Sequence, residues 1–139
     1  MQAALVDARP MVALFGSVQP EQDRYQAMFK QAALEAWSLA TTGPCIVEAS
    51  HLIMPPQCFA LLRLVAEGGV SVFPFDPQDL EPMLTLMRRY TETPRTQMDL
   101  ADASLVWLAS DTGIARVMTM DVRDFSRYRL ADGRSFEIL

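Results

Sequence analysis

Five acidic residues occupy positions from which their side chains could act together, and these are Asp7, Glu48, Asp99, Asp102 and Asp121. Asp7, Glu48 and Asp121 each follow a short apolar run that is typical of a buried β-strand. Ligands of parallel sheets bind beyond the carboxyl ends of the strands, so acids at these ends are expected to converge. Asp99 and Asp102 precede an apolar helical pattern, and their spacing places them on one helix face. The pattern therefore predicts one acidic site.

Carboxylates that gather at one place repel one another, and each raises the pKa of its neighbours. A hard divalent cation removes this conflict, and carboxylate oxygens suit Mg²⁺ or Mn²⁺. Two such ions about 3.5 to 4 Å apart can hold an attacking water and a leaving oxygen around a phosphate. Because the ion lowers the pKa of the water, this chemistry needs no histidine base. The acids therefore predict metal-dependent chemistry on a phosphate.

Each acid also has an ordinary structural explanation, and these alternatives stay open at this point. The letters "DLAD" resemble a helix capping box in which Asp99 accepts backbone N–H groups and Asp102 interacts with the helix dipole. Asp121 could be a turn residue, and Asp7 could pair with Arg9.

The elements that must position the acids alternate between strands and helices. Strands are expected at 3–6, 45–47 and 70–75 and directly before Asp121. Helices are expected from Pro10, from Pro20 to about Thr41, over 48–66 as one helix or a pair broken at 55–56, over 80–90, and after Met98. The last residues, 125–139, suggest a hairpin that turns at 131–133. Such alternation indicates an α/β fold with a mostly parallel sheet, and 139 residues suit one domain over 1–139.

Composition narrows the function classes. The net charge of −5 argues against broad capture of nucleic acid by a basic face, although bound divalent cations would invert the charge locally. No secretory leader and no apolar run of about 20 residues is apparent, so we expect a cytoplasmic protein without a membrane span. Cys45 and Cys58 are expected to be reduced thiols, and His51 is expected to be structural. Neither a phosphate-binding GxxxxGK loop nor a GxSxG nucleophile motif occurs.

Three segments resemble the PIN-domain ribonucleases, and in particular the VapC-type toxins of toxin–antitoxin pairs: "ALVDARPMVALF", "IVEASHLI" and "MDLADASLVWLASDTGIARVMTMDVRDFSRYRL". The resemblance implies a three-layer α/β/α fold and hydrolysis of RNA by an acidic cluster that binds Mg²⁺ or Mn²⁺, leaving 5′-phosphate and 3′-hydroxyl ends. It assigns the four catalytic acids to Asp7, Glu48, Asp102 and Asp121. Asp99 is a further candidate metal ligand and Asp124 a peripheral one. The resemblance also implies a homodimer and an antitoxin whose arginine-bearing tail enters the acidic groove.

The sequence departs from the family pattern beside two of these acids. Ala8 replaces the usual threonine or serine after the first acid, Arg9 replaces a small residue, and Val47 replaces a hydroxyl-bearing residue before Glu48. These changes leave an alternative function open, in which a catalytically weakened PIN-like module acts through an antitoxin-like partner. They also suggest that the Arg9 guanidinium binds phosphate or neutralises an acid. A phospho-acceptor domain is a weaker alternative, because it would need a lysine at a late strand end and the only lysine is Lys30.

Overall fold

The computed structural model describes residues 2–15 and 21–139. In chain order the elements are β1 (Ala3–Val6), α1 (Ala8–Phe15), α2 (Gln22–Leu34), β2 (Ser38–Thr42), α3 (Gly43–His51), α4 (Pro55–Ala66), β3 (Ser71–Phe73), the short 3₁₀ helix η1 (Pro77–Asp79), α5 (Leu80–Tyr90), α6 (Leu100–Thr112), β4 (Arg116–Met118), α7 (Val122–Arg127) and β5 (Glu137–Ile138).

The strands form one sheet in the order β3-β2-β1-β4-β5, and every pairing is parallel. The chain builds outward from β1 to β3 on one side and then returns to add β4 and β5 on the other. This reversal places the topological switch point between β1 and β4, where Leu5 pairs with Val117. In open α/β sheets the crevice at this point is the usual ligand site.

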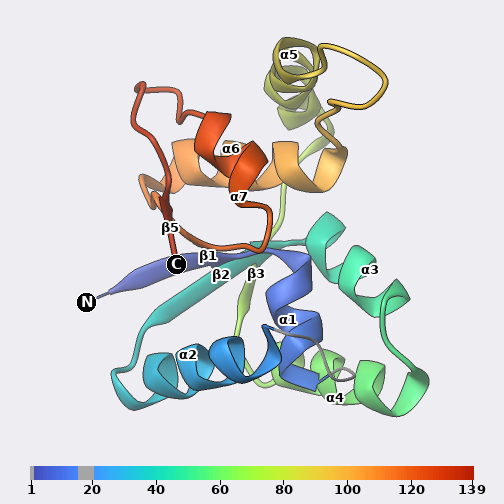
Figure 1. Ribbon diagram of the computed structural model, residues 1–139, viewed down its shortest axis with the longest axis vertical. Helices are drawn as coiled ribbons and strands as arrows, with labels where there is room; N and C mark the ends of the chain where they lie inside the picture. The colour runs from blue at the N-terminus through green and yellow to red at the C-terminus, as the bar shows by residue number, and fades with distance from the viewer. Residues whose placement is uncertain (1, 16–20) are drawn as a thin grey trace.

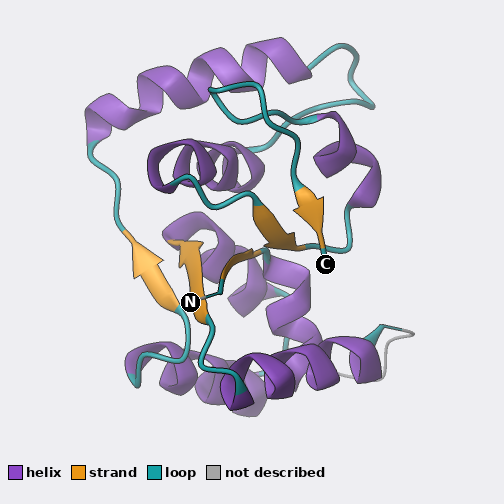
Figure 2. Cartoon of the chain, turned by 90° about the vertical axis from the view of Figure 1, so that its left-hand side faces the viewer, coloured by secondary structure: helices purple, strands orange, loops and turns teal. Residues whose placement is uncertain are grey.

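Helices cover both faces of the sheet, which confirms the predicted three-layer α/β/α architecture. In Figure 1, α1, α2 and α4 lie below the sheet, and α5, α6 and α7 lie above it. Figure 2 shows the same layers after a quarter turn, with the strands between them. Within the described residues, no helix is long and apolar enough to cross a bilayer.

The core centres on β1 and α6. Ala4, Leu5 and Val6 of β1 are fully buried, as expected for a central strand covered on both faces. Helix α6 is buried over most of its surface, begins at the N-cap Asp99 and ends at Gly113, whose φ of +78° suits glycine. These two elements fix the positions of two predicted acids, because Asp7 directly follows β1 and Asp102 lies in the first turn of α6.

Two expectations in the first half of the chain are wrong. The helix expected to reach Thr41 ends at Leu34, and Ser38–Thr42 forms β2; Pro20, where that helix was expected to begin, lies outside the described residues. The strand expected at 45–47 is part of α3, because Pro44 occupies the first turn of that helix, where its missing N–H costs nothing. Glu48 therefore lies on a helix and not at a strand end.

The other expected elements are confirmed with small shifts, including β1, β3, α5, α6, β4 and the break between α3 and α4. The terminal hairpin is only partly formed. Arg129 and Ser135 make one antiparallel bridge, but residues 125 and 126 belong to α7, and β5 pairs with β4 in parallel. Both cysteines are free thiols, with Cys45 buried.

Candidate metal centre

All five predicted acids line one cleft of about 290 Å³, together with Asp124. Ala8, Arg9 and Gln97 complete its lining. The cleft lies at the carboxyl ends of β1 and β4, at the switch point of the sheet. The structure therefore brings together side chains that span most of the sequence, from Asp7 to Asp124.

Asp7 is the most enclosed of these acids, with 8 % of its surface exposed. Its backbone N–H donates to the Met118 carbonyl at 3.0 Å, which fixes Asp7 directly beyond the β1–β4 pair. Its Oδ1 accepts the Ala8 N–H and its Oδ2 accepts the Thr119 hydroxyl, both at 2.8 Å. Burial raises the pKa of Asp7, and these two hydrogen bonds oppose that rise. The carboxylate is held in one orientation.

Thr119 joins two of the acids, and sequence reasoning missed it. Its hydroxyl accepts the Asp121 N–H at 3.0 Å, so the hydroxyl proton is free to go to Asp7. The Tyr25 hydroxyl donates to the Thr119 carbonyl at 2.8 Å and fixes the backbone from the far layer. The one signal in the sequence is a polar residue inside the run "VMTM" before Asp121.

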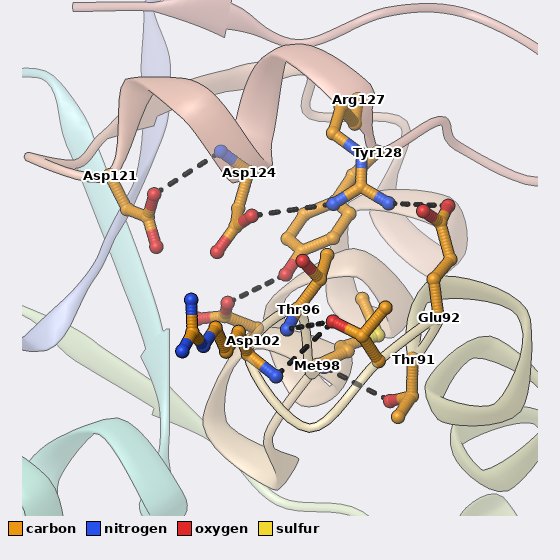
Figure 3. A network of polar contacts seen from close by, with 11 residues as sticks. Thr91, Glu92, Thr96, Met98, Asp102, Asp121, Asp124, Arg127 and Tyr128 are labelled. Carbon is orange, nitrogen blue, oxygen red and sulfur yellow. Dashed lines mark hydrogen bonds and ion pairs between the residues drawn. The ribbon is translucent and has the colours of Figure 1, made fainter.

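Asp102 lies in the first turn of α6, where Asp99 is the N-cap and accepts the Asp102 N–H at 2.8 Å. The capping role predicted for Asp99 is thus confirmed. The Tyr128 hydroxyl donates to Asp102 Oδ2 at 2.8 Å (Figure 3). Burial and the neighbouring charges of Asp7 and Asp99 raise the pKa of Asp102 to about 8. Burial and the Asp102 carboxylate also raise the pKa of Tyr128, so the phenol keeps its proton and acts as a donor.

Asp121 and Asp124 come from the start of α7. Asp121 is its N-cap and accepts the Asp124 N–H at 3.2 Å. One carboxylate oxygen from each of Asp102, Asp121 and Asp124 lies within 4.8 Å of the other two. Asp124, expected to be peripheral, is therefore part of the tightest group of acids in the described part of the chain. Arg127 lies 3.5 Å from Asp124 and 2.8 Å from Glu92, and Figure 3 shows it bridging the two.

Glu48 reaches the cleft from α3, which begins directly after β2. Burial raises the pKa of Glu48, the charges of Asp99 and Asp7 add to the rise, and Arg9 opposes it. Among the described residues Arg9 forms no ion pair, so the suggested Asp7–Arg9 pair does not form. Val47 is 56 % exposed and does not line the cleft, so its missing hydroxyl takes nothing from the acids.

No protein-family model matches the sequence, and no curated protein sequence is significantly similar to it. Solved structures are similar in fold. Mycobacterium tuberculosis VapC20, described as a sarcin-ricin loop cleaving toxin, superposes with a TM-score of 0.74 at 13 % identity over 87 % of this chain and 92 % of its own. The chain has the PIN-domain fold. A chain of VapBC2 from Rickettsia felis, solved bound to a promoter DNA fragment, has a TM-score of 0.67 at 12 % identity over 99 % of both chains. FitAcB from Neisseria gonorrhoeae gives 0.60 at 20 % identity over 96 % of both.

The cleft of this PIN fold thus presents a set of carboxylate oxygens, most of which have no positively charged side chain as an ion-pair partner in the described residues. None of Asp7, Glu48, Asp102 and Asp121 has an ion-pair partner within the described ranges. Burial, with mutual repulsion, raises the pKa of Asp7, Glu48 and Asp102, which means that the cleft favours added positive charge. Among the residues that the structure describes, no histidine or cysteine lines the cleft. An all-oxygen donor set fits Mg²⁺ or Mn²⁺ and does not fit a zinc site built on nitrogen or sulfur.

Proposed function

We propose that this protein is a metal-dependent endoribonuclease of the VapC toxin type, which hydrolyses phosphodiester bonds in RNA. The observation that supports it most is the convergence of six carboxylates in one cleft at the switch point of a PIN fold, five of them without a pairing cation in the described residues. Carboxylates at such close range repel one another, and a bound cation removes this repulsion.

Asp7, Glu48, Asp102 and Asp121 would hold Mg²⁺ or Mn²⁺, with Asp99 and Asp124 as further ligands or as acceptors of bound water. When bound, the ion supplies a Lewis acid that polarises the phosphodiester and lowers the pKa of a nucleophilic water. The acids are prepared for this by the chain itself. Backbone and hydroxyl donors fix Asp7, and the Tyr128 hydroxyl fixes Asp102.

Two residues that line the cleft have roles besides ligation of the cation: Asp102 carries a proton, and Arg9 contacts the substrate. With its pKa raised to about 8, Asp102 holds a proton at neutral pH in the metal-free protein and must release it when a cation binds. Arg9 is exposed at the cleft and unpaired among the described residues, so its guanidinium is available to a phosphate of the substrate. Thr119 donates to Asp7 and thereby supplies a hydroxyl that Ala8 lacks.

The likeness to a toxin that cleaves an RNA loop supports RNA as the substrate. We further propose an antitoxin-like partner whose basic segment enters the cleft, a homodimeric assembly and a cytoplasmic location. Exposed apolar side chains at Val47, Met54 and Phe59 on and between α3 and α4 support a protein partner, because such side chains are usually covered in an interface. Light scattering after size-exclusion chromatography tests the dimer.

The decisive experiment is cleavage of end-labelled single-stranded RNA by purified protein with saturating Mn²⁺, compared with EDTA. We expect cleavage only with the ion, with 5′-phosphate on the downstream product. Asp7→Asn and Asp102→Asn should each lower the rate by more than about 100-fold, while Asp111→Asn, an exposed acid on the same helix as Asp102, should not. Equal cleavage by all variants contradicts the assignment. Absence of both cleavage and any increase in melting temperature with Mn²⁺ supports the alternative binding module.

A further inference from the structure

We propose that Tyr128 is a positioning residue of the metal centre, which holds Asp102 at the separation from Asp121 and Asp124 that cation binding requires. This inference rests on the proposed function and assigns a role to a residue outside the acidic set. It depends on three observations: the contact itself, the rigidity of the tyrosine and the place of the tyrosine on α7.

The contact is direct and selective. The Tyr128 hydroxyl donates to Asp102 Oδ2 at 2.8 Å, so this oxygen is engaged and Oδ1 is left as the acceptor for a cation. No ion pair competes for Asp102 within the described residues. A donor that occupies one oxygen of a ligating carboxylate fixes the rotation of the whole group.

The donor cannot move easily. Tyr128 is 1 % exposed, and its ring meets the rings of Tyr90 and Phe125 edge to face, with centroids 4.9 and 5.0 Å away. Edge-to-face contacts of this kind fix ring orientation as well as position. The hydroxyl is therefore a rigidly placed hydrogen-bond donor for the Asp102 carboxylate.

The place of Tyr128 on α7 gives the contact its consequence. Asp121 is the N-cap of this helix, Asp124 lies in its first turn, and Tyr128 is its C-cap. A single short element thus supplies two acids and the donor that holds a third acid on α6. The phenol is a neutral donor, so it links Asp102 on α6 to the end of α7 without adding charge, and one carboxylate oxygen of each of the three acids lies within 4.8 Å of the others.

The hydroxyl of Tyr25, by comparison, donates to a backbone carbonyl, that of Thr119, at 2.8 Å. Tyr128 is also buried, but its acceptor is a proposed metal ligand. This difference separates the two roles experimentally, because loss of a core hydrogen bond lowers stability, whereas loss of a positioning contact lowers cation affinity.

The test is Mn²⁺ binding by isothermal titration calorimetry to the full chain and to Tyr128→Phe, with the melting temperature in EDTA as the measure of folding. The matched control is Tyr90→Phe, which removes a hydroxyl from the same aromatic group; that hydroxyl accepts the Arg129 N–H and has no hydrogen bond with an acid among the described residues. We expect Tyr128→Phe to raise the Kd for Mn²⁺ by about 10- to 100-fold and Tyr90→Phe to leave it within about twofold. With added Mn²⁺ the RNA cleavage rate of Tyr128→Phe should recover.

A rescue variant sharpens the result. 4-Aminophenylalanine at position 128 keeps a donor and should restore the Kd to within about threefold of the native value. If Tyr128→Phe does not fold, 4-fluorophenylalanine fills the space of the hydroxyl without donating and takes its place. An unchanged Kd in the non-donating variant, beside native Mn²⁺ binding, overturns the role of Tyr128 and leaves the proposed function standing. Absence of Mn²⁺ binding by the native protein overturns both.

Discussion

The Thr119 hydroxyl donates a hydrogen bond to Asp7 Oδ2 at 2.8 Å, across 112 residues of sequence. The same hydroxyl accepts the Asp121 N–H, so one buried side chain links the acid that follows β1 with the acid that caps α7. Because Tyr25 holds the Thr119 carbonyl from α2, the layer below the sheet also contributes to the geometry of the acids. The acidic cleft thus depends on neutral hydroxyl donors as well as on the acids themselves.

Thr119→Val should weaken both stability and cation binding. The change leaves the Asp121 N–H without its acceptor and Asp7 Oδ2 without its donor, so we expect a loss of about 1–3 kcal/mol in the free energy of unfolding. Mn²⁺ affinity should fall by about tenfold or more, because Asp7 loses one of the two hydrogen bonds that hold its carboxylate in one orientation. Urea unfolding and calorimetry measure the two effects. Thr119→Ser keeps the hydroxyl and should restore most of both; equal defects in Thr119→Ser and Thr119→Val would show that the methyl group matters instead.

The metal-free protein should lose stability as the pH rises toward 8. The pKa of Asp102 is raised from 3.8 to about 8, so between these values the folded state holds a proton that the unfolded chain has released. Stability from this group is greatest below the ordinary pKa and is lost as the pH rises to about 8. The raised pKa values of Asp7, Glu48 and Asp124 act in the same direction. Melting temperatures in EDTA from pH 5 to 8.5 measure the effect.

Asp102→Asn and Mn²⁺ are the two controls for this pH dependence. The variant removes the repelled charge, so it should flatten the profile and melt above the native protein at pH 8 in EDTA. Saturating Mn²⁺ binds the ionised acids, so the increase in melting temperature that it causes should be larger at pH 8 than at pH 6. A metal-free melting temperature that rises steadily over this range contradicts the prediction.

The acids could be predicted from the sequence where local pattern determines their place. Asp7 follows a short apolar strand, and Asp102 lies in the first turn of a capped helix. The sequence places Glu48 at the cleft correctly, but the strand predicted directly before it is wrong. The three apolar residues "CIV" suit a strand and a buried helix equally well, and in the structure they belong to α3. The expected gathering of acids survived this error because α3 begins at the same sheet edge where that strand would have ended.

Thr119 and Tyr128 could not be predicted in the same way. Their contacts join residues 112 and 26 positions apart, and no periodicity encodes which hydroxyl will meet which carboxylate. The resemblance to the PIN family instead drew attention to Ala8 and Val47, where this sequence lacks the hydroxyl-bearing residues of the family pattern. In the folded chain Thr119 donates to Asp7 from the position directly after β4, and Val47 is exposed away from the cleft.

Arg9→Ala should weaken RNA binding without weakening metal binding. Arg9 is exposed at the cleft, and no carboxylate pairs with it in the described part of the chain, so its charge is available to one substrate phosphate. We expect KM to rise several-fold with little change in kcat, and the slope of log KM against log salt to fall by about one. Cleavage kinetics over a series of KCl concentrations measure both. Arg24→Ala is the control, because Arg24 pairs with Glu21 on the surface and does not line the cleft; an equal loss in both variants would indicate a general charge effect.

Two substitutions of Asp99 separate its capping role from a role at the cation. Asp99→Asn keeps a side-chain oxygen for the Asp102 N–H, so stability should change by less than about 0.5 kcal/mol, while Mn²⁺ affinity falls several-fold because one negative charge is lost. Asp99→Ala also loses the cap and should cost about 1 kcal/mol more in the free energy of unfolding. Urea unfolding in EDTA and Mn²⁺ titration distinguish the two. If Asp99→Asn binds Mn²⁺ as tightly as the native protein, Asp99 serves only to start α6, and the cation depends on the remaining acids.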